Sequence, residues 1–127
     1  MIVTTPMTAH RDDRGEITDL LVGERVDAVT LITSRAGVVR GNHYHKETVQ
    51  WVYLLHGRIR VAARREAAAA EELDIAPGQL VRHDAMEAHS ILALEDSTFL
   101  VFTKGPRQGE EYESDTYRID EPLQSSI

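Results

Sequence analysis

Apolar and polar residues alternate along several short segments of the chain, which is the pattern of β-strands with one buried face. Gly, Pro, Asp and Asn separate these segments, for example at Asp12-Asp13-Arg14-Gly15, His56-Gly57 and Pro77-Gly78, where tight reversals are expected. The pattern predicts strands over residues 28–33, 38–45, 50–55, 58–63, 79–83, 89–94 and 98–103. We therefore expect an antiparallel all-β domain.

One segment contradicts an all-β pattern locally. Residues 66–73, Glu-Ala-Ala-Ala-Ala-Glu-Glu-Leu, have high helix propensity. We interpret the segment as an excursion within a hairpin, with a single helical turn as the alternative.

The predicted strand 50–55 is apolar on both faces. Val52 and Leu54 alternate to one side, and Trp51 and Tyr53 to the other. A strand that is apolar on both faces needs a second cover. We therefore expect Trp51 and Tyr53 to lie under another subunit, in a homodimer.

The length and the overall hydrophobicity fit one globular domain over residues 1–127, with a polar arm at 104–127 that either wraps the barrel or frays. No apolar run approaches the roughly 18 to 20 residues that cross a bilayer, so no membrane role is expected. The N-terminal residues lack the basic start and apolar stretch of a secretory signal, and cytoplasmic localisation is the expectation.

The chain contains no cysteine, so any metal must be bound by nitrogen and oxygen atoms. Its formal net charge is −7 and its arginines are scattered along the sequence. Nucleic-acid binding requires a concentrated basic face, so this class of function is not expected.

The candidate chemistry lies in the run Gly41-Asn42-His43-Tyr44-His45. Two histidines separated by one residue on a strand point to the same face. If Gln50 on the next strand and His89 on a later strand join them, three imidazoles and one amide oxygen converge. Such a set suits a divalent transition metal: zinc, manganese, iron, nickel or copper.

These residues resemble the cupin superfamily, in which a first motif of glycine, His-x-His, Glu and glycine is followed by a second motif that ends in histidine. His43, His45, Gln50 and Gly57 match the first spacing, and Pro77-Gly78 through His89 resembles the second. The two motifs cover about residues 41–93. The resemblance implies a jelly-roll barrel, also called a double-stranded β-helix, of the single-domain type related to the dTDP-sugar epimerases.

The chain departs from this family pattern at two places. Glutamine stands at position 50, where glutamate is usual, which removes one negative charge and is expected to weaken metal binding. Glu47 is the alternative fourth ligand, although only Gln50 keeps the spacing to Gly57. Asp84 and Met86 replace the usual Pro-x-Gly before His89. The other histidines have weaker claims: His83 is expected at the surface or a strand end rather than at the pocket mouth.

Further segments are similar to cupins that act on nucleotide-linked sugars. Asp13-Arg14-Gly15 and Arg40-Gly41-Asn42-His43 resemble segments of the 3,5-epimerases and 3,4-ketoisomerases, and the run 41–45 also resembles capsular-polysaccharide cupin domains. Residues 105–113 resemble such enzymes less specifically. The resemblance implies a small-molecule substrate, such as a nucleotide-linked sugar, with His43 as a base and Arg40 as a cation for an enediolate or a diphosphate.

Two other classes of function remain open on the sequence. Three neutral ligands and a weak amide leave open positions on a metal, which would suit a metal-dependent oxygenase or lyase. A non-catalytic ligand-binding or sensor cupin would use the same pocket.

Overall fold

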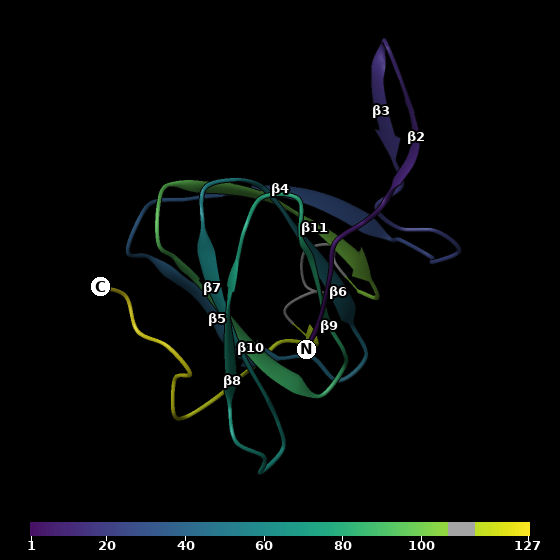
Figure 1. Cartoon of the computed structure of the whole chain (residues 1–127). Coiled ribbons are helices and arrows are strands. Elements are labelled where there is room, and N and C mark those ends of the chain that lie inside the picture. The colour runs from purple at the N-terminus through teal and green to yellow at the C-terminus, as the bar shows by residue number, and fades with distance from the viewer. Residues whose placement is uncertain (107–113) are drawn as a thin grey trace.

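The computed structural model describes residues 1–106 and 114–127, which form two five-stranded antiparallel sheets and a separate hairpin (Figure 1). The first sheet holds, in spatial order, β1 (Ile2–Thr4), β9 (Leu80–His83), β6 (Val49–His56), β11 (Ser97–Lys104) and β4 (Ala28–Ser34). The second holds β12 (Tyr117–Arg118), β5 (Val39–Tyr44), β10 (Glu87–Ala93), β7 (Ile59–Arg65) and β8 (Glu71–Ile75). From β4 onward the chain crosses repeatedly between the sheets, which produces the jelly-roll barrel expected from the motifs.

Each of the seven predicted strands corresponds to an observed strand, with ends that agree within two residues. The helix-prone segment 66–73 is a hairpin excursion, as interpreted: the chain reverses after β7, and β8 pairs antiparallel with β7. The turn at Asp12–Gly15 joins β2 (Thr8–Asp12) to β3 (Gly15–Thr18), and this hairpin projects away from the barrel (Figure 1).

The hydrophobic core lies between the two sheets. Its buried members come from both walls: Val52, Leu54, Ile59, Val61, Ile75, Val81, Ile91, Phe99 and Val101. Along β11, from Ser97 to Lys104, buried residues on the core side of the strand alternate with half-buried residues on its outer side. No helix of the described residues is long and apolar enough to cross a membrane.

Trp51 lies on the outer side of β6 and yet is only 4% exposed in the single chain. The Arg82 guanidinium and the Lys104 ammonium lie 5.8 and 5.9 Å from the centre of its ring. The expectation that Trp51 needs a partner subunit for its burial is therefore wrong, because its own chain covers the indole. Tyr53, two residues along the strand, remains half-buried.

The C-terminal residues pack against the second sheet, where β12 extends it beyond β5. The Gln124 amide donates to the Ser90 hydroxyl at 2.8 Å, and the Asn42 side chain accepts a hydrogen bond from the backbone N–H of Leu123 at 2.8 Å. The end of the predicted arm thus wraps the barrel. Residues 107–113, including most of the sugar-cupin-like segment at 105–113, lie outside the described residues.

Candidate metal centre

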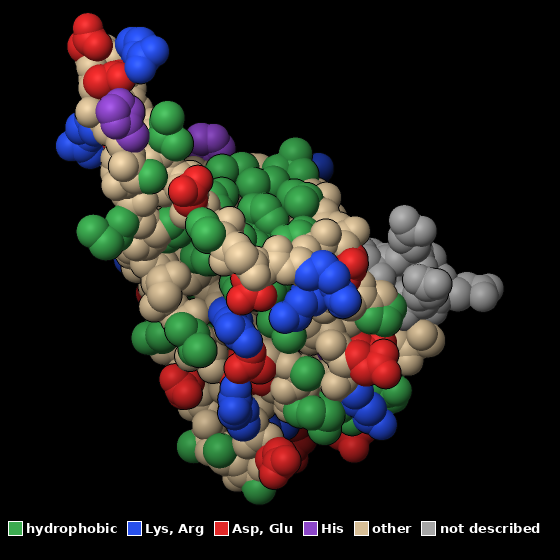
Figure 2. Space-filling model, turned by 90° about the vertical axis from the view of Figure 1, so that its right-hand side faces the viewer, with side chains coloured by type: hydrophobic (Ala, Val, Ile, Leu, Met, Phe, Trp, Pro, Cys, Tyr) green, Lys and Arg blue, Asp and Glu red, His purple; other side chains and the backbone are tan. Residues whose placement is uncertain are grey.

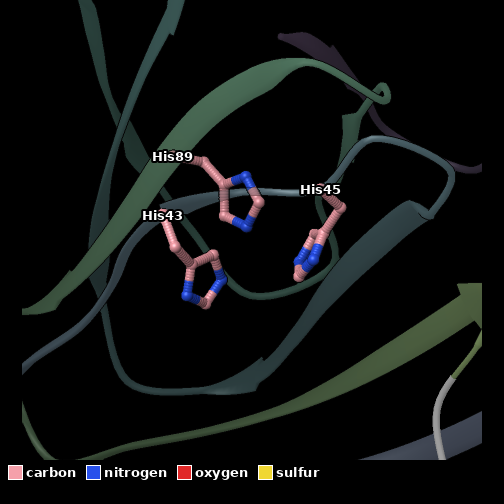
Figure 3. A group of neighbouring side chains, drawn as sticks. All are labelled: His43, His45 and His89. Carbon is pink, nitrogen blue, oxygen red and sulfur yellow. The ribbon is translucent and has the colours of Figure 1, made fainter. Parts of the chain in front are cut away.

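Three histidines converge inside the barrel, as the sequence predicted. His43 lies on β5, His45 directly follows that strand, and His89 lies on β10 opposite His43. One ring nitrogen from each lies within 4.8 Å of the others, and Figure 3 shows the three rings turned toward one common space. His45 and His89 are buried and His43 is half-buried.

Backbone carbonyls fix two of the three imidazoles. The Nδ1 atom of His45 lies 2.8 Å from the carbonyl oxygen of Asp115, and that of His89 lies 3.0 Å from the carbonyl oxygen of Glu87. A carbonyl oxygen only accepts hydrogen bonds, so Nδ1 carries the proton in both rings and Nε2 carries the lone pair. Metal-binding histidines are commonly oriented in this way.

His43 and His89 favour the neutral form. Burial, reinforced by the neighbouring His45, Arg118 and His83, lowers the pKa of His43 to about 4. Burial also holds the pKa of His89 well below its ordinary value, with further contributions from His83 and His43. Neutral imidazole is the form that binds a metal, so no proton has to leave these two rings near neutral pH.

The structure places Gln50, and not Glu47, beside the histidines. Gln50 is buried on β6 and lines the cavity next to His43 and His89. Glu47 is exposed in the turn between β5 and β6, where its backbone N–H donates to the Asp115 carboxylate. The predicted fourth position is therefore geometrically accessible to the amide.

Gly41 allows β5 and β10 to approach closely at the site. It has a φ of +94°, and a Cβ atom there would lie 2.9 Å from the His89 carbonyl oxygen and 3.2 Å from the Ser90 Cα. The register between the two strands shifts between His89 and Ser90. Glycine at this position thus keeps His43 and His89 adjacent.

A cavity of about 410 Å³ adjoins the histidines between the two sheets. Its walls are apolar over Ile32, Val52, Ile91, Phe99 and Val101, and Arg40 and Arg118 add positive charge. Arg40 donates from Nε to the Ser34 hydroxyl at 2.7 Å and from an Nη atom to the Thr33 carbonyl at 3.0 Å. Tyr44 and Tyr53 are not among the lining residues; Tyr44 stacks on Tyr117, in line with a packing role.

His83 is the last residue of β9, at a strand end as expected, but it does not lie at the surface. Its side chain is buried, and its ring stacks on His89 with centroids 4.5 Å apart and planes inclined by 15°. Its Nδ1 lies 3.1 Å from the Glu87 carboxylate, which also pairs with the Met1 ammonium. Strand periodicity did not reveal the contact between His83 and His89. It forms because β9 pairs with β6 in the first sheet and so lies across the barrel from β10 in the second.

A family model for the polysaccharide biosynthesis C-terminal domain matches residues 10–117. The chain belongs to this family. The match spans most of the chain and includes all four predicted ligand positions. None of the curated proteins matches the sequence.

Solved structures similar to this member of the family share its fold. The 3,4-ketoisomerase QdtA from Thermoanaerobacterium thermosaccharolyticum, in complex with TDP, has a TM-score of 0.76 at 16% identity, covering 94% of this chain and 88% of that chain. The dTDP-4-dehydrorhamnose 3,5-epimerase from Sulfolobus tokodaii has a TM-score of 0.72 at 22% identity, covering 93% and 79%. The capsular polysaccharide assembling protein CapF from Staphylococcus aureus has a TM-score of 0.66 at 21% identity, covering 90% of this chain but 32% of CapF. The barrel has the RmlC-like cupin fold, as the motifs indicated.

Proposed function

We propose that this protein is a metal-binding cupin enzyme that isomerises or epimerises a nucleotide-linked keto sugar. Its metal is one divalent transition ion, zinc, manganese, iron, nickel or copper, on His43, His45 and His89, with the Gln50 amide oxygen as fourth ligand. The observation that carries the metal assignment is the convergence of three ring nitrogens within 4.8 Å, two of the rings being fixed at Nδ1 by backbone carbonyls. Three imidazoles and an amide form a donor set for transition metals rather than for calcium or magnesium.

The residues that line the cavity next to the histidines favour a small anionic substrate. Arg40 and Arg118 would bind a phosphate or diphosphate group, since guanidinium forks match such oxygens. The apolar walls would hold the rest of the molecule and exclude water. The similarity in fold to a TDP-bound ketoisomerase and to a 3,5-epimerase favours a nucleotide-linked sugar among anions of this size.

The low pKa of His43 favours a ligand role for this residue over a role as general base. A base is most effective when its pKa is near the working pH, and a pKa of about 4 makes His43 a weak proton acceptor at neutral pH. A bound divalent ion would polarise the keto oxygen of the substrate and stabilise negative charge on it. In the metal-free alternative, His43 is the base and Arg40 the cation beside the enediolate.

Elemental analysis of protein purified without a histidine tag tests the metal assignment. We expect about one equivalent of a transition metal, and its loss in His43→Ala, His45→Ala and His89→Ala. His10→Ala is the matched control, because His10 is exposed on the projecting hairpin. Equal metal content in all four variants would contradict the ligand set, and no metal in the native protein would favour the metal-free isomerase.

The substrate is tested separately by thermal unfolding with dTDP- and UDP-linked sugars. Stabilisation by a nucleotide sugar, followed by turnover of its 4-keto form, would support the isomerase. Bound iron or manganese with oxygen uptake would instead indicate an oxygenase. Binding without turnover would indicate a sensor.

We also propose a homodimer formed through the outer face of the first sheet. Across β4, β11 and β6, Leu31 pairs with Leu100 and Leu100 with Tyr53, so one row of this face is apolar. Leu31 and its neighbour Val29 are 63% and 59% exposed. Figure 2 shows hydrophobic side chains gathered beside the base of the projecting hairpin.

A second copy is the occupant that covers both exposed features. An isolated two-stranded hairpin is marginal in water, and Ile17 on β3 is exposed, so the hairpin also needs a cover. In a twofold dimer the hairpin and the apolar face of each copy are buried by the other. We expect a dimer by light scattering at tens of micromolar and a monomer for Leu31→Asp, with Leu73→Asp on the other sheet as control; a monomeric native protein would overturn the proposal.

A further inference from the structure

The Glu87 and His83 side chains form a buried polar pair behind the metal site, and this pair has an unused acceptor. His83 donates from Nδ1 to the Glu87 carboxylate, because an ionised carboxylate only accepts. The Nε2 atom of the same ring then carries a lone pair. It is buried and has no hydrogen-bond partner among residues 1–106 and 114–127. A buried acceptor without a donor is costly, so a partner is expected.

Gln50 is the residue placed to supply that donor. In the pairing of β6 with β9, Gln50 lies directly opposite His83. Directly opposed side chains on adjacent strands point to the same face, with Cβ atoms about 5 Å apart. Both side chains are buried, and Gln50 also lines the cavity beside the histidines.

His83 itself is not positioned to bind the ion of the three-histidine cluster. A metal lies in the plane of the imidazole that binds it, and the His83 and His89 planes are nearly parallel and stacked. Two stacked planes do not meet at one ion. The ligand cluster therefore consists of the three side chains in Figure 3, His43, His45 and His89. His83 stacks on His89 and is not part of it.

We propose that His83 is a positioning residue: its Nε2 accepts a hydrogen bond from the Gln50 amide nitrogen, which turns the amide oxygen of Gln50 toward the metal. This inference rests on the proposed metal site. It accounts for glutamine at position 50, because an ionised glutamate there would place an acceptor opposite the lone pair of His83. Glu87 adds a second hydrogen bond to this series, because its carboxylate accepts from His83 Nδ1 and so fixes the His83 tautomer.

A double-mutant cycle tests the coupling through metal affinity. His83→Phe keeps a ring to stack on His89 but removes the acceptor. We expect it to lower the zinc or cobalt affinity roughly 10- to 100-fold, the usual effect of losing a residue that orients a ligand. In the Gln50→Glu background the same change is expected to alter affinity less than about threefold, because no amide has to be oriented. An equal loss in both backgrounds would show that His83 acts only by packing and would overturn the proposal.

A measurement on the metal-free protein separates this inference from the metal assignment. Nitrogen-15 NMR should show a coupling across the hydrogen bond between the Gln50 amide nitrogen and His83 Nε2, and should lose it in Gln50→Glu but not in His10→Ala. No coupling, or a His83 Nε2 bound to water, would overturn the positioning role even if the protein binds metal. If the coupling is present but the protein takes up no metal, the hydrogen bond is confirmed and the proposed metal site is wrong.

Discussion

The backbone carbonyl of Asp115 binds the ring of His45, and the carboxylate of the same aspartate binds the turn that follows His45. The His45 Nδ1 donates to the Asp115 carbonyl at 2.8 Å, while the Asp115 carboxylate accepts the Thr48 hydroxyl at 2.7 Å and backbone N–H groups of the turn after His45. Burial alone would raise the pKa of Asp115, but these hydrogen bonds outweigh it and lower the pKa. One residue near the end of the chain thus fixes both the histidine and its turn.

Asp115→Asn should therefore affect stability more than metal binding. The amide has one acceptor oxygen in place of two, so some donors of the turn lose their partner, which costs about 1–3 kcal/mol of unfolding free energy. The backbone carbonyl that fixes His45 remains, and we expect metal affinity to fall less than tenfold. Denaturant unfolding and chelator competition measure the two effects, with Asp120→Asn, an exposed position, as control. A large loss of affinity without a loss of stability would contradict this division.

Gly41→Ala should damage the site through a steric contact and not through backbone strain alone. The new Cβ would meet the His89 carbonyl, forcing β5 away from β10 and separating His43 from His89. Gly78 is a matched control, because its φ of +90° is nearly that of Gly41 while nothing lies within 4 Å of its Cβ position. We expect Gly78→Ala to cost stability by strain but to retain metal, and Gly41→Ala to lose both. Similar metal binding in the two variants would argue against the steric role.

Strand periodicity predicted the strands of the barrel, because it is a local pattern, and the cupin-like motif spacing predicted that His89 joins His43 and His45. The contacts that were missed are set by pairing between distant strands. His83 and Gln50 meet only because β9 lies beside β6, and Arg118 reaches the cavity because β12 adds to β5. Trp51 was assigned to an interface because its strand is apolar on both faces. Arg82 and Lys104 cover its side chain instead, and no sequence pattern indicates such a contact.

The metal-free protein should lose stability as the pH falls below the ordinary histidine range. The pKa of His43 is lowered to about 4 in the folded state, first by burial, and the pKa of His89 is lowered too. The unfolded chain, with histidine pKa values near 6.5, binds more protons below that pH. Stability is therefore full above about pH 6.5 and falls as the pH drops toward 4, by about 1.4 kcal/mol per pH unit for each extra proton taken up on unfolding.

Urea unfolding at several pH values, in the presence of a chelator, measures this slope. His43→Gln removes one of the titrating groups and should make the slope shallower between pH 6.5 and 4. His10→Ala, which removes an exposed histidine, serves as control. A metal-free protein with equal stability at pH 7.5 and pH 5 would contradict the neutral state of His43 and His89 in the folded protein.

Arg40 and Arg118 should contribute to anion binding to similar extents but differ in their effect on stability. Loss of a charge-assisted hydrogen bond to a diphosphate costs about 1.5–3 kcal/mol, so Arg40→Gln and Arg118→Gln should each weaken TDP binding about tenfold or more. Arg40 also donates to the Ser34 hydroxyl and the Thr33 carbonyl, so its replacement should lower the unfolding free energy by about 1 kcal/mol. Arg118 is exposed on β12, and its replacement should leave stability nearly unchanged. Calorimetric titration of TDP into both variants separates the two roles, with Arg58→Gln as an exposed control outside the cavity. Unchanged affinity in all three variants would show that the anion does not bind in this cavity. A loss of affinity in Arg118→Gln alone would show that Arg40 only holds β4 against β5.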